Sequence, residues 1–134
     1  MIDDPMAGCR VLVVEDEILI AIEIEDTLKA LGCEVVGLVG KLDEALELAV
    51  SAAIDAAILD VRIRGGDVFP VTEKLLERNI PFILSSGYGD WALPEALRGR
   101  PRLTKPFTPA ELEEQVRLLC RSAGDLKAGE ARSA

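Results

Sequence analysis

The stretch Ala56-Ala57-Ile58-Leu59-Asp60 decides the fold that we predict for this sequence. Four apolar residues lead directly into one carboxylate, and a glycine-containing turn, Arg64-Gly65-Gly66-Asp67, follows soon after. A continuous apolar run of this length, closed by a turn signal, is typical of a strand buried on both faces of a parallel sheet. Ligands of open α/β sheets bind in the crevice beyond the carboxyl ends of the strands. We therefore expect Asp60 at the rim of such a crevice.

The composition indicates one acidic α/β domain. A chain of 134 residues can bury a substantial core, and this core must be aliphatic, because 49% of the residues are apolar and only 4% are aromatic. The formal net charge of −9 argues against direct binding of DNA or RNA, which requires clustered lysine and arginine. No apolar run reaches the length of a membrane span, and no signal peptide opens the chain, so we expect a cytoplasmic protein.

Histidine and cysteine usage excludes several site types. The chain has no histidine, which excludes Ser-His hydrolases, histidine-ligated metals and histidine phosphorelay donors. Cys9, Cys33 and Cys120 are odd in number and far apart in sequence, so they indicate neither a disulfide framework nor a zinc site.

Strands and helices are expected to alternate along the chain. We predict strands at residues 10–14, 34–39, 56–60, 81–85 and 102–104. The helices between them are a first one ended by Gly32, a second over 41–52, and a third capped by Asp67 and running to about Arg78. Alternation of this kind predicts parallel strands, right-handed crossovers and helices on both faces of the sheet.

The second half of the chain is less regular. Between the fourth and fifth strands, glycines and prolines leave room only for a short, irregular fourth helix around Glu95-Ala96-Leu97. Thr108-Pro109-Ala110-Glu111 combines a capping box with proline at the first helical position, and it opens the last helix. We expect residues 1–8 to form a loose arm, residues 9–122 the domain, and residues 123–134 a disordered tail.

Polar side chains follow the ends of the predicted strands. Glu15, Asp16 and Asp60 converge if the first and third strands are neighbours. Mg²⁺ suits such a site, because it takes carboxylate ligands, keeps water and accepts a phosphate oxygen. A carboxylate beside the metal can then act as a nucleophile toward phosphorus. Ser86 and Lys105, also at strand ends, can neutralise the phosphoryl oxygens through a hydroxyl and an ammonium group.

Each of these residues has an ordinary structural reading as a helix cap, a turn residue or a surface lysine, but the whole set in this order is specific. Residues 9–122 resemble a response-regulator receiver domain. The motifs that carry the resemblance are Val13-Val14-Glu15-Asp16-Glu17, Ile58-Leu59-Asp60, Ser86-Gly87 and Lys105-Pro106-Phe107.

The resemblance implies a role for each site residue. Asp60 would accept the phosphoryl group, and Mg²⁺ would be held by Asp60, by the acidic pair Glu15 and Asp16, and by the backbone carbonyl of Arg62. Ser86 would be the switch residue and Lys105 the phosphate-binding lysine. The resemblance further implies the flavodoxin-like strand order 2-1-3-4-5 and a cis bond before Pro106.

One position departs from the receiver pattern. Receivers usually carry tyrosine or phenylalanine in the middle of the fifth strand, where this chain has Arg102. The segment Leu84-Ser85-Ser86-Gly87-Tyr88-Gly89 instead resembles a variant of the stand-alone Phe-Ala-Thr-Gly-Tyr-Gly subgroup. We expect Ser86 to draw Tyr88 and the mobile segment up to Arg100 into a readout surface; a tyrosine that only covers the loop is the alternative.

The resemblance predicts a signalling domain that does not turn over a substrate. Its expected phosphoryl donor is a sensor histidine kinase or a histidine phosphotransfer protein. The signal would leave by contact with a downstream protein or by onward phosphotransfer, because the residues after Ala123 are too few to fold alone. A weak or phosphorylation-dependent homodimer is compatible with this scheme.

Two alternatives stay open: a receiver-like interaction module that acts without phosphorylation, and a Mg²⁺-dependent aspartyl phosphohydrolase. Such hydrolases place a second acidic residue two positions after the nucleophile, where this chain has Arg62. A flavin-binding protein is disfavoured, since the loop Glu15-Asp16-Glu17 would repel a phosphate.

Overall fold

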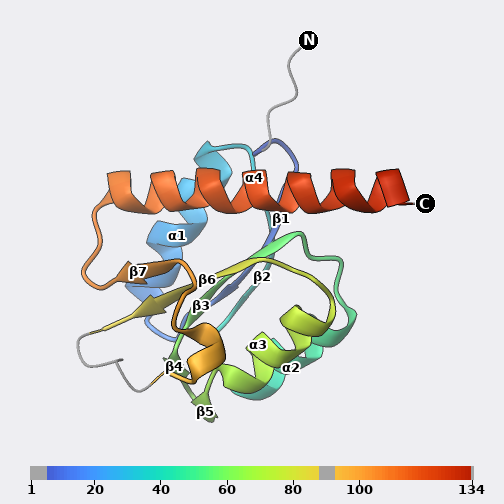
Figure 1. Ribbon diagram of the computed structural model, residues 1–134. Helices are drawn as coiled ribbons and strands as arrows, with labels where there is room; N and C mark the ends of the chain where they lie inside the picture. The colour runs from blue at the N-terminus through green and yellow to red at the C-terminus, as the bar shows by residue number, and fades with distance from the viewer. Residues whose placement is uncertain (1–5, 88–92, 134) are drawn as a thin grey trace.

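The computed structural model describes residues 6–87 and 93–133, with side chains through Leu126. Its centre is a parallel sheet of five strands in the order β2-β1-β3-β6-β7 (Figure 1). The strands are β1 (Arg10–Val14), β2 (Glu34–Val39), β3 (Ala56–Asp60), β6 (Phe82–Ser86) and β7 (Arg102–Thr104). This is the predicted flavodoxin-like order, and only the fourth predicted strand is displaced, by one residue.

Helices cover both faces of the sheet. α1 (Ile18–Ala30) and α4 (Pro109–Ser133) lie on one face, and α2 (Leu42–Ser51) and α3 (Phe69–Glu77) lie on the other (Figure 1). The predicted irregular fourth helix is a single 3-10 turn, η1 (Glu95–Leu97).

The sequence explains two of the helix ends. Gly32 adopts a φ of +92° just after α1. At the start of α4, the backbone N–H of Glu111 donates to the hydroxyl of Thr108, the residue before the helix, at 3.1 Å.

The core has two halves, one on each face of the sheet. Every residue of β3 is buried, and its side chains alternate between the halves. Ile58 belongs to the half beneath α1 and α4, whereas Leu59 belongs to the half beneath α2 and α3. A strand with apolar contacts on both faces cannot move without disrupting both, so β3 holds the position of Asp60.

A small hairpin directly after Asp60 was not predicted. β4 (Arg62–Ile63) pairs antiparallel with β5 (Gly66–Asp67). Gly65 and Gly66 make the turn, with φ of +101° and +139°, values that disfavour a side chain. The predicted capping of α3 by Asp67 is wrong, because Asp67 lies in this hairpin and α3 begins after Val68 with no side-chain cap bond.

Residues 6–8 and 123–133, near the two ends of the chain, are more ordered than predicted. α4 continues to Ser133, whereas we expected disorder from residue 123. Ala123 is buried against the half of the core beneath α1 and α4, and no proline follows that would interrupt the helix. In the expected loose arm, residues 1–5 lie outside the described residues, but Met6 is buried and Gly8 donates to the carbonyl of Gly32 at 2.9 Å.

The three cysteines are free and buried. The fold brings the sulfurs of Cys33 and Cys120 to 3.8 Å from one another, a proximity that their sequence spacing does not reveal. No helix within the described ranges combines the length and the apolar character needed to cross a membrane.

Candidate functional site

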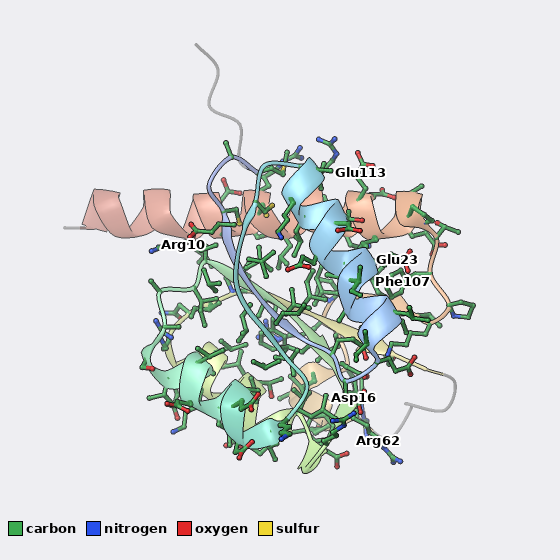
Figure 2. The ribbon with its side chains drawn as sticks, turned by 180° about the vertical axis from the view of Figure 1, so that it is seen from behind. Arg10, Asp16, Glu23, Arg62, Phe107 and Glu113 are labelled. Atoms are coloured by element: carbon green, nitrogen blue, oxygen red, sulfur yellow. The ribbon has the colours of Figure 1, made fainter. Side chains whose placement is uncertain are left out.

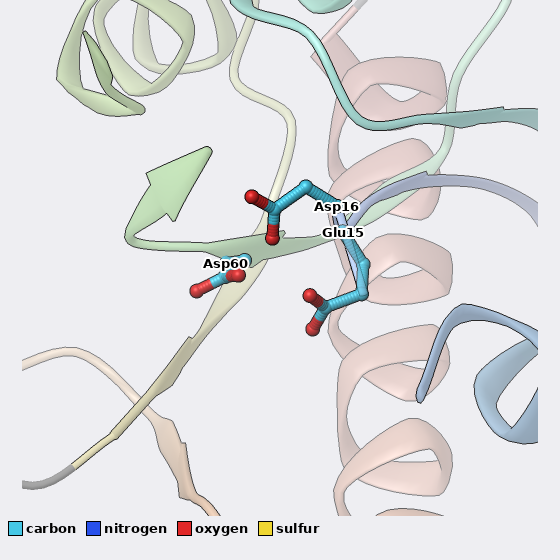
Figure 3. Close-up of side chains that lie close together, drawn as sticks. All are labelled: Glu15, Asp16 and Asp60. Carbon is cyan, nitrogen blue, oxygen red and sulfur yellow. The ribbon is translucent and has the colours of Figure 1, made fainter. Parts of the chain in front are cut away.

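Three carboxylates meet at the carboxyl ends of β1 and β3. Carboxylate oxygens of Glu15, Asp16 and Asp60 all lie within 4.8 Å of one another (Figure 3). β1 and β3 are neighbours in register, with Val14 opposite Leu59, so the residues after each strand emerge side by side. Glu15 and Asp60 are buried, at 4% and 8% exposure. The predicted convergence of the three carboxylates is therefore confirmed.

A glycine lets the loop after β2 close over the acidic pair. The Glu15 N–H donates to the carbonyl of Val39 at 2.9 Å, and Gly40 follows at once. A Cβ added at Gly40 would lie 3.0 Å from the Cα of Asp16 and 3.2 Å from the carbonyl oxygen of Glu15. Both of these are backbone atoms that cannot rotate away, so a side chain at this position would displace the acidic pair.

Lys105 supplies the compensating charge. Its Nζ lies 2.8 Å from Glu15 Oε1 and 3.2 Å from Asp60 Oδ2. Its backbone N–H donates to the carbonyl of Ser86 at 2.8 Å, which holds this lysine beside the end of β6. The bond to Pro106 is cis, as predicted. Asp60 and Lys105, 45 positions apart in sequence, thus form one partly buried charged site.

Burial and charge shift the ionisation of the site. Desolvation, followed by the neighbouring Glu15, raises the pKa of Asp60 to about 7, although Lys105 acts in the opposite direction. Burial alone would lower the pKa of Lys105, but the close ion pair with Glu15 and the charge of Asp60 outweigh it, and the net shift is upward. Among the described residues, Lys105 is the only cation paired with this cluster of three carboxylates, so one ammonium does not balance their negative charge.

Glu15 retains unused acceptor capacity. Its Oε2 accepts the N–H of Glu17 at 3.1 Å. Its Oε1 makes the close ion pair with Lys105 but has no aligned hydrogen-bond donor in the described part of the chain. A buried carboxylate oxygen without a donor, beside two further carboxylates, matches the oxygen ligands that Mg²⁺ prefers. The residues present therefore fit a magnesium ion.

Ser86 and Arg62 lie where the sequence placed them. Ser86 is the last residue of β6, is buried, and is paired in register with Thr104. Arg62 opens β4 just after Asp60; its side chain is 83% exposed and lies 3.7 Å from Asp67. Figure 2 shows Arg62 and Asp16 at the same end of the molecule. Metal binding by the Arg62 carbonyl and the switch role of Ser86 stay predictions.

Of the two predicted readout positions, Arg102 and Tyr88, the structure describes only Arg102. Arg102 lies in the edge strand β7, exposed and paired with Leu84. Tyr88 and part of the segment predicted to be mobile lie outside the described residues.

Sequence reasoning missed one side chain at the site. Ser85 is paired in register with Asp60, is 1% exposed, and its hydroxyl has no hydrogen-bond partner among the described residues. A polar residue closing the apolar run Phe82-Ile83-Leu84 was the available signal. From the sequence we expected a role only for Ser86, the serine that follows it.

A cavity of about 230 Å³ adjoins the acidic cluster on the side of the edge strand β2. Apolar side chains of α1 and β2 line it together with two cations and part of the acidic cluster. Its lining includes Ile18, Ile22, Leu38, Lys41 and Arg64. The first three are also exposed, at 71%, 44% and 38%, and Leu19 beside them is 83% exposed. An apolar surface therefore borders the charged site.

Comparisons with known proteins agree with this geometry. The profile of the family described as "Response regulator receiver domain" matches residues 11–117. The transcriptional regulatory protein PdtaR of Mycobacterium tuberculosis is 31% identical over 113 residues, covering 81% of this chain and 55% of PdtaR. The chain thus spans about half the length of the curated relatives it matches.

Solved structures show the same likeness. The solution structure of SdrG from Sphingomonas melonis Fr1 is 40% identical, with a TM-score of 0.71, and the match covers 84% of this chain and 98% of SdrG. The receiver domain of sensor histidine kinase PA1611 from Pseudomonas aeruginosa, solved with magnesium in its active-site cleft, is 26% identical, with a TM-score of 0.67 and coverage of 85% and 98%. The chain therefore belongs to the response regulator receiver domain family of two-component signalling.

Proposed function

We propose that Asp60 accepts a phosphoryl group from the phosphohistidine of a sensor histidine kinase or histidine phosphotransfer protein. One observation carries the proposal: Asp60 is a buried carboxylate held between an acidic pair and the ammonium of Lys105, at the position where receivers carry their acceptor. An ion pair made only for stability would not need two further carboxylates at the same point, since these raise the cost of burying Asp60.

The transfer is an in-line displacement at phosphorus. An Asp60 oxygen forms the new P–O bond, the P–N bond of the donor breaks, and its electron pair stays on the donor imidazole. Lys105 neutralises the phosphoryl oxygens, and the Ser86 hydroxyl donates to one of them. Mg²⁺ held by Glu15, Asp16, Asp60 and the Arg62 carbonyl would neutralise the remaining charge and favour the ionised form of Asp60.

A donor protein requires a docking surface near the acceptor. We propose that the apolar surface formed by Ile18, Leu19 and Ile22 on α1 serves this purpose, since it borders the site and is exposed. Burial of large apolar side chains stabilises association, and solvated charges beside them steer the approach.

We also propose a route by which the signal leaves. Arg102 is exposed at the sheet edge, and burying its guanidinium unpaired would be costly, so the inward movement of a fifth-strand aromatic has no counterpart here. This supports a readout through Ser86 and Tyr88, in a variant of the Phe-Ala-Thr-Gly-Tyr subgroup that acts by protein contact or onward phosphotransfer. Tyr88→Ala should then abolish phosphorylation-dependent partner binding, whereas Arg102→Ala should preserve it.

Labelling by a small phosphoryl donor tests the proposed function. The protein is incubated with acetyl phosphate and Mg²⁺, and the intact mass is followed with time. We expect one phosphoryl group per chain, lost when a chelator is added or when Asp60→Asn replaces the nucleophile by an amide of the same shape. Failure of the unaltered protein to gain the group would instead favour an interaction module that works without phosphorylation.

A further inference from the structure

Ser85 is a buried donor that the proposed chemistry has not used. Its residue is 1% exposed, and its hydroxyl has no partner within the described part of the chain. Leaving a buried hydroxyl unbonded costs stability, and native structures rarely do so without a reason. The cost is needless in purely structural terms, because alanine would fill the same space without a polar group.

The sheet register places Ser85 beside the acceptor. Ser85 pairs with Asp60 on one side and with Leu103 on the other, so only Asp60 offers an acceptor among these two neighbours. Paired residues share a face of the sheet, as Ile58 and Ile83 do two residues earlier, where both contact the half of the core beneath α1 and α4. With strands about 4.8 Å apart, a hydroxyl can reach a neighbouring carboxylate after one rotation about χ1.

Asp60 has another donor in the unphosphorylated protein. Lys105 Nζ lies 3.2 Å from Asp60 Oδ2. Once a phosphoryl group is attached, its oxygens compete for this ammonium, and the carboxyl oxygen that is not esterified loses its donor. Ser85 carries a hydroxyl at the position paired in register with Asp60, and this hydroxyl can replace the lost donor.

We propose that Ser85 is a further catalytic residue of the site, which donates a hydrogen bond to the Asp60 carboxyl oxygen and shortens the lifetime of the phosphoryl group. This inference rests on the proposed function of Asp60. In hydrolysis, the oxygen of water forms a bond to phosphorus, the bond between phosphorus and Asp60 breaks, and its electron pair returns to the carboxylate while water releases a proton to solvent.

The direction of the effect follows from the charge. A hydrogen bond to a carboxylate is roughly twice as strong as one to a neutral carbonyl, so this bond strengthens as the carboxylate leaves. An interaction that is stronger in the transition state than in the ground state accelerates the step. Ser85→Ala should therefore prolong the phosphorylated state, by about fivefold if the gain is about 1 kcal/mol.

The test compares phosphoryl lifetime with folded stability. The unaltered protein, Ser85→Ala and the exposed control Ser51→Ala are loaded with acetyl phosphate and Mg²⁺ and freed of the donor, and the decay of the phosphorylated mass is followed. We expect Ser85→Ala to decay about fivefold more slowly and Ser51→Ala to match the unaltered protein. The urea midpoint of unphosphorylated Ser85→Ala should equal or exceed that of the unaltered protein, because an unbonded hydroxyl has been removed.

Ser85→Cys supplies a second variant of similar size with a weak donor, and it should decay as slowly as the alanine variant. Equal lifetimes in Ser85→Ala and the unaltered protein would overturn the role of the hydroxyl while leaving Asp60 as the acceptor. A lower urea midpoint in Ser85→Ala with an unchanged lifetime would show a structural hydroxyl and would overturn it too. Absence of labelling in the unaltered protein would remove the proposed function, and this inference with it.

Discussion

Replacing Asp60 by asparagine should stabilise the metal-free protein at neutral pH. Asp60 is 8% exposed, and burial together with Glu15 raises its pKa from 3.8 to about 7. The folded state therefore binds a proton more tightly than the unfolded state, and stability falls as the pH rises from about 4 to about 7. Asparagine has no charge to desolvate, so the variant should not show this loss.

The structure sets the size of the effect. A pKa raised from 3.8 to about 7 corresponds to a ceiling of about 4 kcal/mol at pH 8, at about 1.4 kcal/mol per pH unit. This ceiling already contains the opposing effect of Lys105, and relaxation with water penetration makes the real cost of burying a carboxylate smaller than the ceiling. We expect a net stabilisation of about 2 kcal/mol, or a rise in Tm of about 7 °C for a chain of 134 residues.

Thermal or urea unfolding in a chelator, from pH 4 to pH 8, measures this difference. The gap between the variant and the unaltered protein should be near zero at pH 4, widen up to about pH 7 and then level off. Asp55→Asn is the matched control, because the Asp55 carboxylate accepts three hydrogen bonds from Arg10, at 2.9, 3.0 and 3.0 Å, and its loss should lower stability. An Asp60→Asn variant that unfolds at or below the temperature of the unaltered protein at pH 8 would refute the reasoning.

Further substitutions test the cations, the backbone and the metal ligands. Lys105→Met should slow labelling by acetyl phosphate about 100-fold at saturating Mg²⁺, since one cation facing the developing charge is lost; a rate within twofold of normal would exclude that role. Gly40→Ala should weaken Mg²⁺ binding in calorimetry and lower the free energy of unfolding by about 1–3 kcal/mol, because its Cβ would lie 3.0 Å from the Cα of Asp16. Asp16→Ala should reduce Mg²⁺ affinity more than Glu15→Ala, because Glu15 is already paired with Lys105 at 2.8 Å; equal losses would contradict this ranking.

The sequence predicted the sheet well because its strands are buried on both faces. Runs such as Val11-Leu12-Val13-Val14 and Ala56-Ala57-Ile58-Leu59 have no other stable environment, so their limits agree with the observed β1 and β3. The acidic cluster followed from the same logic, since residues that end neighbouring parallel strands must emerge at one edge. The side chains of Glu15, Asp16 and Asp60 were placed correctly for that reason.

The missed features depend on contacts that no local pattern contains. The hairpin β4–β5 forms two residues after Asp60, and there the backbone of Arg64 donates to Gly40 and accepts from Leu42, at 3.2 and 2.8 Å. The extension of α4 was read as a polar tail because Ala123 gives no sign in sequence that it packs on the core. The proximity of Cys33 and Cys120 likewise arises only when α4 crosses the sheet.

Identification of the phosphorylated atom tests the central claim most directly. The protein is loaded with acetyl phosphate and Mg²⁺, reduced with borohydride, which converts an aspartyl phosphate into homoserine, and digested for peptide sequencing by mass spectrometry. The account predicts homoserine at position 60, and none there when Mg²⁺ is withheld. Homoserine at position 16, or a phosphoryl group that resists borohydride and maps to Ser85 or Ser86, would contradict it.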